Sequence, residues 1–281
     1  MRIFIYYILF FFSVSVFSQK DTVIQYITYK GLPTKKLSNA HFYQVQTKES
    51  DSLYKMMQFK KSGKLMWVGY STTPDHKNSK IGQMIDFDRN DSIRSIRFFN
   101  KQGKIHGKAQ AWFDNRKKNY EGRFINGKRE GLWRYYHYNG RIAQQGFFKN
   151  DSLVKAAYFD EEGNKMPSCM ECRDNAEFKG GMNKFRREFR KLMKRVSDDI
   201  SKRIKSRYQF KILITFIIEV DGKVRYVEVD ESLPLQNRLT IINGIKNIEG
   251  WQPKIVHNRK VPSYFRIPVT LTKDEQDFET F

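Results

Sequence analysis

The residues with the clearest chemical potential are two cysteines in a C-x-x-C pair, Cys169 and Cys172. Such a pair is half of a zinc site, and the sequence has neither a second C-x-x-C nor an H-x3-H to complete one. A redox pair normally opens a helix after a strand, whereas this pair follows Pro167 in a loop pattern. We therefore expect a local disulfide or reduced structural thiols rather than redox chemistry.

The other residues suited to catalysis do not form a recognisable site. The five histidines are scattered through turns and strands without metal-ligand spacing, as His41, His76, His106, His137 and His257. The sequence shows no ordered Ser-His-Asp set, no glycine-rich phosphate loop and no closely spaced carboxylate pair in a familiar context. We therefore assign no catalytic residue, no metal and no cofactor, and predict that the protein is not an enzyme.

Composition limits the classes of protein that remain. The chain has 281 residues, with 52 Lys+Arg against 30 Asp+Glu and a formal net charge of +22. This length favours about two domains with real cores, and an aromatic content of 15% argues against wholesale disorder. A mean hydropathy of -0.67 excludes a polytopic membrane protein. The positive charge implies an anionic neighbour.

The N-terminal residues predict where in the cell the protein is located. Residues 3–17 carry no charge and follow Arg2, and as a helix they would span about 22 Å, less than the ~30 Å hydrocarbon core. Val16 and Ser18 fall at positions -3 and -1 of a cleavage site, so residues 1–18 read as a signal peptide and the mature protein as periplasmic. The alternative is an anchor of residues 3–17 in the inner membrane. Export makes nucleic acid an unexpected partner and anionic lipid or glycan surfaces expected ones.

A repeated pattern fills the middle of the chain. An aromatic residue is followed four positions later by a turn residue and eleven later by another aromatic, in copies that begin at Phe59, Phe87, Phe113 and Tyr136. A fifth copy begins at Phe159 and then runs out. Gly63 and Asp91 occupy the turn slot, while Lys117 fits it poorly. Asn126-Gly127 and Asn139-Gly140 read as type I′ hairpin turns. Residues 59–165 are predicted to form an antiparallel β-meander of hairpin repeats, with 19–58 as a β-rich lead-in to the same sheet.

Part of this repeat resembles a known family. Residues 127–140, GKREGLWRYYHYNG, are similar to a repeat of the membrane occupation and recognition nexus (MORN) type, and residues 103–107 open a weaker copy. The resemblance implies a ribbon of β-hairpins that serves as an interaction scaffold and has no chemistry of its own.

After Met166 the pattern changes from a period of two to a helical period. Apolar residues recur at helical spacing from Met182 to Ile204, followed by strand-like runs at 212–218 and 224–229 that flank Asp221-Gly222. A second helix is predicted from Leu235 to Ile248, ended by Gly250, and then a strand at 264–271. The whole chain is thus predicted to be α+β, with a two-layer αββαβ domain at 177–273, a linker at 166–176 and an acidic tail at 274–281.

The C-terminal domain also resembles a family. The matching residues are 177–182, 220–224 and 251–253, followed by 261–269; they include Gly180, Gly181, Asp221, Gly222, Trp251, Pro253 and Pro268. They are similar to the C-terminal domain of TonB, the energy transducer of Gram-negative envelopes. The resemblance implies a periplasmic domain that captures an extended segment of an outer-membrane transporter by strand addition.

The last strand is the expected pairing edge. Pro268 cannot donate to a sheet ladder, so it confines this strand to an edge or a bulge, and an open edge is a template for another strand. On the resemblance, Ser263 to Leu271 would pair with the partner, and the residues expected to bind it are Tyr264, Phe265, Arg266, Ile267 and Val269.

Two functions remain open from the sequence. The first is a non-enzymatic envelope interaction protein that binds a transporter segment, or another envelope protein, in energy-dependent transport. The second is a basic repeat scaffold that binds anionic membrane or polysaccharide. The first helix is strongly basic between Lys184 and Arg195; such a helix either lies on an anionic membrane or presents a solvated face while its apolar face packs in the core. The oligomeric state stays open.

Overall fold

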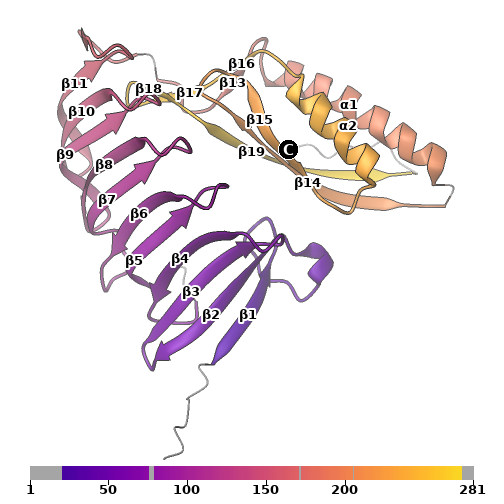
Figure 1. Ribbon diagram of the computed structural model, residues 1–281, viewed down its shortest axis with the longest axis horizontal. Helices are drawn as coiled ribbons and strands as arrows, with labels where there is room; N and C mark the ends of the chain where they lie inside the picture. Colours follow the sequence, from indigo (N-terminus) through magenta and orange to yellow (C-terminus); the bar gives the residue numbers. More distant parts are fainter. Residues whose placement is uncertain (1–20, 76–78, 171, 205, 274–281) are drawn as a thin grey trace, which may run out of the picture.

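The computed structural model describes residues 21–75, 79–170, 172–204 and 206–273. The predicted signal peptide and the predicted acidic tail lie outside these residues. Within them, no helix is both long and apolar enough to cross a membrane. The chain is mostly antiparallel β with two α-helices in the described part, consistent with the predicted α+β class (Figure 1).

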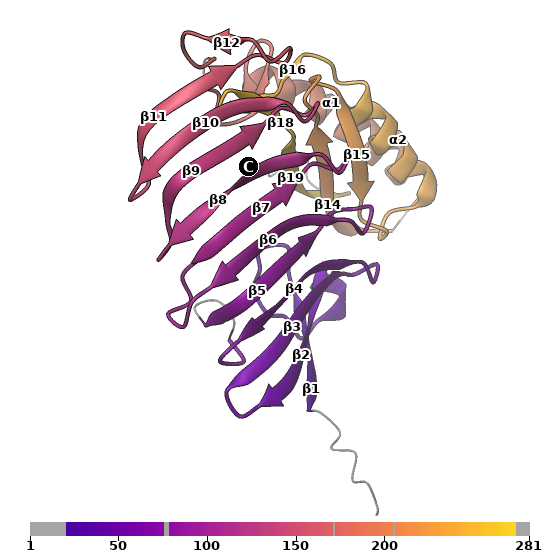
Figure 2. The same cartoon turned by 60° about the vertical axis from the view of Figure 1, so that its left-hand side comes forward.

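Twelve strands form one antiparallel sheet in strict chain order, which confirms the predicted meander. The sheet is a long curved ribbon (Figure 2), and residues before Phe59 supply its first strands, as expected. A short 3-10 helix, η1 (Leu37–Asn39), follows β1. The strands are β1 (Thr22–Ile27), β2 (Phe42–Ser50), β3 (Leu53–Lys60), β4 (Leu65–Ser71), β5 (Lys80–Phe87), β6 (Ile93–Phe99), β7 (Gly107–Trp112), β8 (Lys118–Ile125), β9 (Lys128–Tyr136), β10 (Ile142–Lys149), β11 (Ser152–Phe159) and β12 (Lys165–Met166).

The turns along one side of the ribbon share one geometry. In each, the amide of the first residue donates to the carbonyl four residues later, and the amide of the fourth residue donates back to the first. The fourth residue has a positive φ, a backbone conformation that glycine adopts at a lower energetic cost than any other residue. This is a type I turn closed by a left-handed residue. The left-handed residues in successive hairpins are Gly63, Asp91, Arg116, Gly140 and Gly163.

This geometry corrects two sequence predictions. The predicted type I′ turn at Asn139-Gly140 is wrong, because only the glycine has a positive φ, whereas Asn126 and Gly127 both have one, at 50° and 90°, as that turn requires. The third repeat is also displaced by one residue. Trp112, not Phe113, pairs with the residue six positions later, as Phe87 does in the preceding copy, and this displacement explains why Lys117 fitted the turn slot poorly.

The ribbon has a small core of its own. Trp133 is 2% exposed and packs against the rings of Tyr120, Tyr135, Phe124 and Phe148. These residues lie on one face because alternate residues of a strand share a face. This face is turned toward the C-terminal part of the chain, and we call it the inner face.

The C-terminal module is a three-stranded sheet with two helices on one side (Figure 1). Its core joins the apolar face of the first helix to alternate residues of β14, Ile212, Ile214, Phe216 and Ile218. The elements are β13 (Glu177–Phe178), α1 (Met182–Arg203), β14 (Gln209–Ile218), β15 (Val224–Val229), α2 (Leu235–Lys246), β16 (Trp251–Gln252), β17 (Lys254–Val256), β18 (Arg259–Val261) and β19 (Ser263–Thr272). The αββαβ elements are therefore present, although α2 ends two residues before the predicted Ile248.

Two strand pairs of this module were not predicted. β13 pairs with β16, and β17 pairs with β18 in a short hairpin. Each strand has only two or three residues, too few for a periodic pattern to appear in the sequence.

The ribbon covers the face of the three-stranded sheet opposite the helices. Leu213 and Ile217 alternate with the core residues of β14, yet they are only 8% and 7% exposed. Two neighbouring side chains on that face reach the ribbon: Glu228 accepts a hydrogen bond from Lys60 at 2.8 Å, and Arg266 lies over the ring of Phe42. The central strand β14 is thus buried between the helices and the ribbon.

Candidate functional site

The predicted binding strand, β19, lies at the edge of the three-stranded sheet. The strand order is β15-β14-β19, and within the described residues β19 pairs with β14 alone. Tyr264 is 62% exposed and Arg266 is exposed. Phe265 instead stacks on Phe216 at 5.2 Å, while Ile267 and Val269 are buried in the core, so that three of the five expected side chains face inward.

Pro268 shows which backbone groups of β19 face outward. The register with β14 runs without a shift from Gln209↔Thr272 to Ile218↔Ser263, through the Leu213↔Pro268 pair. Because proline has no N–H to give, it fits an uninterrupted ladder only where its nitrogen points away from β14. Backbone alternation then turns the amide of Thr270 outward as well. This edge offers donors and acceptors in the spacing that a further strand needs.

Two of the motif residues that the resemblance singled out, Gly222 and Trp251, lie in contact. Trp251 pairs with Phe178 across β16 and β13, and its ring packs at 5.1 Å from that ring. The turn at Gly222 lies against the backbone of Trp251: a Cβ at Gly222 would be 2.4 Å from the Trp251 carbonyl oxygen. Gly181, with φ 81°, is the N-cap of α1. These residues brace the module.

Other motif residues have related structural roles. Gly180 also has a positive φ, and the Pro253 carbonyl accepts a hydrogen bond from Arg173 at 3.1 Å. Asp221 caps its own turn, accepting from the Lys223 amide at 3.0 Å and from Arg225 at 2.8 Å. These contacts are all structural.

The cysteine pair lies apart from β19, between the two modules. Cys169 and Cys172 are both free and exposed, so no disulfide joins them in this structure. Burial, followed by the neighbouring Cys169, raises the pKa of Cys172, which disfavours a reactive thiolate. Within the described residues, no group of three or more His, Cys, Asp or Glu side chains is placed to hold a metal ion.

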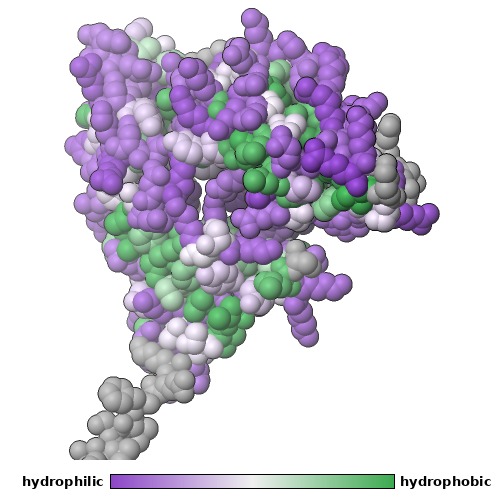
Figure 3. Space-filling view, turned by 45° about the vertical axis from the view of Figure 1, so that its right-hand side comes forward, coloured by the Kyte–Doolittle hydropathy of each residue, from purple (hydrophilic) through white to green (hydrophobic). Residues whose placement is uncertain are grey.

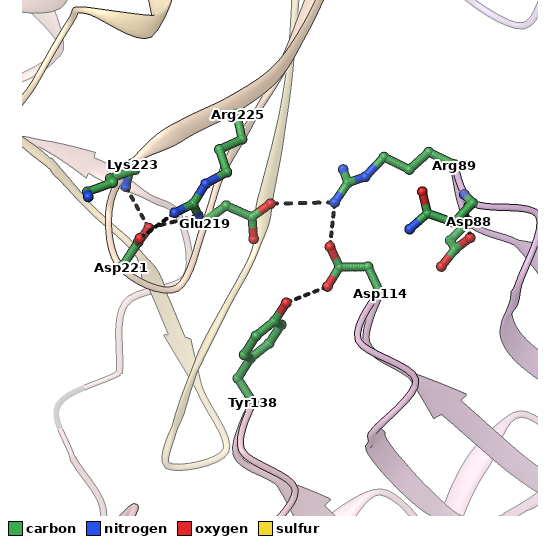
Figure 4. Close-up of polar contacts among 9 residues, drawn as sticks. Asp88, Arg89, Asp114, Tyr138, Glu219, Asp221, Lys223 and Arg225 are labelled. Carbon is green, nitrogen blue, oxygen red and sulfur yellow. Dashed lines mark hydrogen bonds and ion pairs between the residues drawn. The ribbon is translucent and has the colours of Figure 1, made fainter.

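A charge cluster that the sequence analysis missed joins the ribbon to the turn between β14 and β15 (Figure 4). Arg89 donates to Asp114 at 2.5 Å and lies 3.6 Å from the Glu219 carboxylate. Asp114 accepts a second hydrogen bond from the Tyr138 hydroxyl at 2.7 Å. The Arg89 guanidinium also lies over the ring of Tyr226. One cation therefore serves two carboxylates from different modules.

The surroundings of this cluster shift the pKa values of Glu219 and Tyr138. Burial, followed by the nearby Asp114 charge, raises the pKa of Glu219, and Arg89 opposes this shift. Burial and the hydrogen bond to Asp114 raise the pKa of Tyr138, which keeps the phenol protonated as a donor. The ribbon residues hold equivalent positions in successive turns, the second residue in each case, and so could have been found by aligning the repeats. Glu219 lies outside the repeats, and no sequence pattern marked it.

A second contact inserts the β17–β18 hairpin into the inner face of the ribbon. At the hairpin tip, the Asn258 amide group donates to the carbonyls of Ala143 at 3.1 Å and Phe159 at 2.8 Å, and its oxygen accepts from the Met170 amide at 2.6 Å. Asn258 is fully buried. These three hydrogen bonds are therefore shielded from water, where they are stronger and fix the position of the hairpin tip more tightly.

The residues beside Asn258 complete this contact. The ring of His257 stacks on Tyr135 with 3.8 Å between centroids. Arg259, 4% exposed, donates to Asn119 and lies 5.0 Å from the same tyrosine ring. Burial lowers the pKa of Arg259 to about 10 and that of His257 to about 4. The imidazole is therefore neutral at pH 7.

Comparisons with known proteins add little. No protein-family model matches the chain, and no curated protein matches it. One similar solved structure is a mutant of S. aureus TarM in complex with fondaparinux, alpha-GlcNAc-glycerol and UDP, at TM-score 0.25 and 16% identity over 40% of this chain and 21% of that chain. Another is a GtfA/B complex bound to UDP and GlcNAc, at TM-score 0.19 and 10% identity over 50% of this chain and 26% of that chain.

The chain therefore spans about a fifth to a quarter of the solved chains it resembles. Similarities of this size define neither a fold nor an activity.

Proposed function

We propose that the protein is a non-enzymatic, periplasmic envelope protein whose TonB-like C-terminal module captures an extended segment of an outer-membrane transporter by strand addition at β19, with a MORN-like ribbon as its scaffold. The observation that carries the proposal is the ten-residue edge strand with an unbroken register on its β14 side. Added strands gain main-chain hydrogen bonds of about 1 kcal/mol each, which suits a reversible contact.

The side-chain arrangement fits this mode of binding. Phe265, Ile267 and Val269 fix β19 in the core, so the strand can accept a partner without moving. Tyr264 and Arg266 stand on the other face beside the position of an added strand and can choose among partners. Transport driven by an inner-membrane motor is the use that the TonB resemblance implies.

The test is photo-crosslinking in intact cells of the source bacterium. A photoreactive phenylalanine analogue at Tyr264 should crosslink to an outer-membrane transporter, identified by mass spectrometry. The same analogue at the exposed ribbon residue Leu153 is the control position. Crosslinks to transporters from both positions equally would contradict capture at β19.

A substitution pair separates strand addition from side-chain contact. Thr270→Pro removes an outward amide donor, so it should weaken the Tyr264 crosslink roughly fivefold while leaving the β14 pairing intact. Thr270→Val keeps the donor and should preserve the crosslink. Equal crosslinking by the two variants, both folded by circular dichroism, would rule out an added strand.

A further inference from the structure

The exposed half of α1 carries a dense set of cations. Six apolar residues of the helix, from Phe185 to Ile200, are buried against the sheet. The opposite side is exposed and holds Lys184, Arg186, Arg187, Arg190, Lys191, Lys194 and Arg195. At 100° per residue these seven side chains spread over about half of the helix circumference. They form a broad positive surface, which we call the α1 basic face.

Acidic neighbours neutralise little of this charge. Within Met182–Arg195 the single carboxylate is Glu188, which lies 3.4 Å from Lys191 and 3.9 Å from Arg187. Asp199 lies further along the helix, where it pairs with Arg203. The first four turns of α1 therefore keep most of their positive charge.

This arrangement works against the stability of the helix. Backbone dipoles make the N-terminal end of a helix positive, so Lys184 in the first turn is unfavourable. The cations that lie four residues apart along α1 also repel each other. The first turn has no acidic residue, and the N-cap, Gly181, supplies no side-chain hydrogen bond. The helix therefore carries more positive charge than its own stability favours, which fits a role in binding an anion.

The shape of the surface decides which kind of anionic partner fits. α1 and α2 lie side by side as one layer over the sheet (Figure 1), and hydrophilic side chains gather over this layer in the space-filling view (Figure 3). A single polyanion strand would need a row of cations in a groove, whereas the α1 basic face is wide and convex. A broad surface of many anions can contact several of these cations at once, which a single strand cannot.

We propose that the α1 basic face docks on the surface of an anionic phospholipid bilayer. The apolar face of α1 stays in the core, so the contact is peripheral; each cation near the membrane surface adds to the attraction, and salt screens it. The docking is independent of strand addition at β19 and would hold the protein at a membrane while the edge remains open.

The test is co-sedimentation of residues 19–281 with lipid vesicles. Vesicles of phosphatidylcholine with 30% phosphatidylglycerol should bind the protein at 50 mM salt and release it at 500 mM, while pure phosphatidylcholine should not bind it. Lys184→Gln, Arg187→Gln, Lys191→Gln and Lys194→Gln combined should weaken binding at least tenfold. The matched control neutralises four exposed ribbon lysines, Lys101, Lys108, Lys149 and Lys155, and should change binding less than twofold.

Three results would overturn the proposal. Equal losses in the two quadruple variants would mean that net charge acts without a defined surface. Unchanged binding by the α1 variant would place the contact elsewhere. Tighter retention of the unmodified protein on heparin than on the anionic vesicles, with the same sensitivity to the α1 substitutions, would assign the surface to a polysaccharide. An unfolding midpoint for each variant guards against loss of fold.

Discussion

Single residues fix the packing of the ribbon, and Gly122 is the clearest case. It lies in β8 directly beneath the Trp133 ring, where a Cβ would be 2.2 Å from a ring carbon. The Trp133 ring therefore leaves no room for a side chain at this position. The same reasoning does not apply to Gly69, whose added Cβ would meet the flexible Met84 side chain at 3.3 Å.

We expect Gly122→Ala to destabilise the protein by about 3 kcal/mol, because the rigid Trp133 ring must leave its site. Gly69→Ala should cost less than about 1 kcal/mol, since Met84 can adjust. Urea unfolding followed by tryptophan fluorescence measures both. Equal costs would show that the ring in the ribbon core is not the limiting contact.

His257 makes stability depend on pH. Its pKa is lowered to about 4 by burial and by the positive charge of Arg259, from an ordinary value of 6.5. The folded state thus binds the proton less readily than the unfolded state, and stability is lost as the pH falls from about 6.5 toward 4. The raised pKa of Glu219 acts in the opposite direction, so the comparison requires a variant.

We expect His257→Phe, which keeps a ring against Tyr135, to flatten this dependence. The difference in urea midpoint between pH 7 and pH 5 should be smaller in the variant than in the unmodified protein. Glu219 contributes equally to both proteins and cancels. An identical pH dependence in the two would mean that His257 titrates normally in the folded state.

Among the elements, the short β17–β18 hairpin makes the most specific contact. Its tip residue Asn258 has φ 60° and makes three side-chain hydrogen bonds to ribbon and linker backbone. A glycine in place of Asn258 could keep this backbone conformation but would lose the three side-chain hydrogen bonds. Asn150, with φ 52°, is a matched position in an exposed ribbon turn.

We expect Asn258→Gly to cost roughly 3 kcal/mol, about 1 kcal/mol for each lost hydrogen bond. Asn150→Gly should be close to neutral, because the same backbone freedom is gained without loss of buried contacts. Thermal unfolding of both variants tests this difference. A neutral Asn258→Gly would show that the hairpin is not anchored in solution.

The charge cluster allows a test of coupling between the modules. Arg89→Met leaves Asp114 and Glu219 without their shared cation and should cost on the order of 3 kcal/mol. In a Glu219→Gln background the same substitution should cost less, because one buried charge has been removed. A double-mutant cycle by urea unfolding gives the coupling directly. Strictly additive effects would mean that Glu219 is not held by Arg89.

The elements differ in how far the sequence predicted them. Strands β1 to β11, the helices and β14, β15 and β19 were predictable because their alternation, apolar run or helical period extends over six residues or more. The hairpin around Asn258 was not, since its strands have three residues each. The edge position of β19 followed from Pro268 alone, whereas the exposure of Tyr264 and burial of Ile267 needed the register with β14.

At the scale of the whole molecule, the two modules share a buried surface. No local pattern could predict that docking, because residues such as Arg89 and Glu219 lie more than a hundred positions apart and each reads as a solvated turn residue. The apolar Leu213 and Ile217 gave the one indirect signal, a central strand that is apolar on both faces.

We expect the isolated module, residues 166–281, to expose Leu213 and Ile217 and to self-associate. Size-exclusion chromatography and binding of a hydrophobic dye should reveal this, and Leu213→Thr with Ile217→Thr should reduce both signals. The full chain should remain soluble and bind little dye. A monomeric, dye-free module would show that the ribbon is not needed to cover that face.

The docking also constrains how this ribbon can evolve. Arg89 and the Ala143 carbonyl, in separate hairpins, are held by one rigid module. Because neighbouring strands lie about 4.8 Å apart, duplication of one hairpin between them would displace one anchor by about 10 Å. In tandem repeat arrays each repeat normally contacts only its neighbours, so a change in copy number leaves the other contacts intact. Between Arg89 and Ala143 the number of hairpins therefore cannot change without loss of one contact, and new repeats could be added only toward the β1 end.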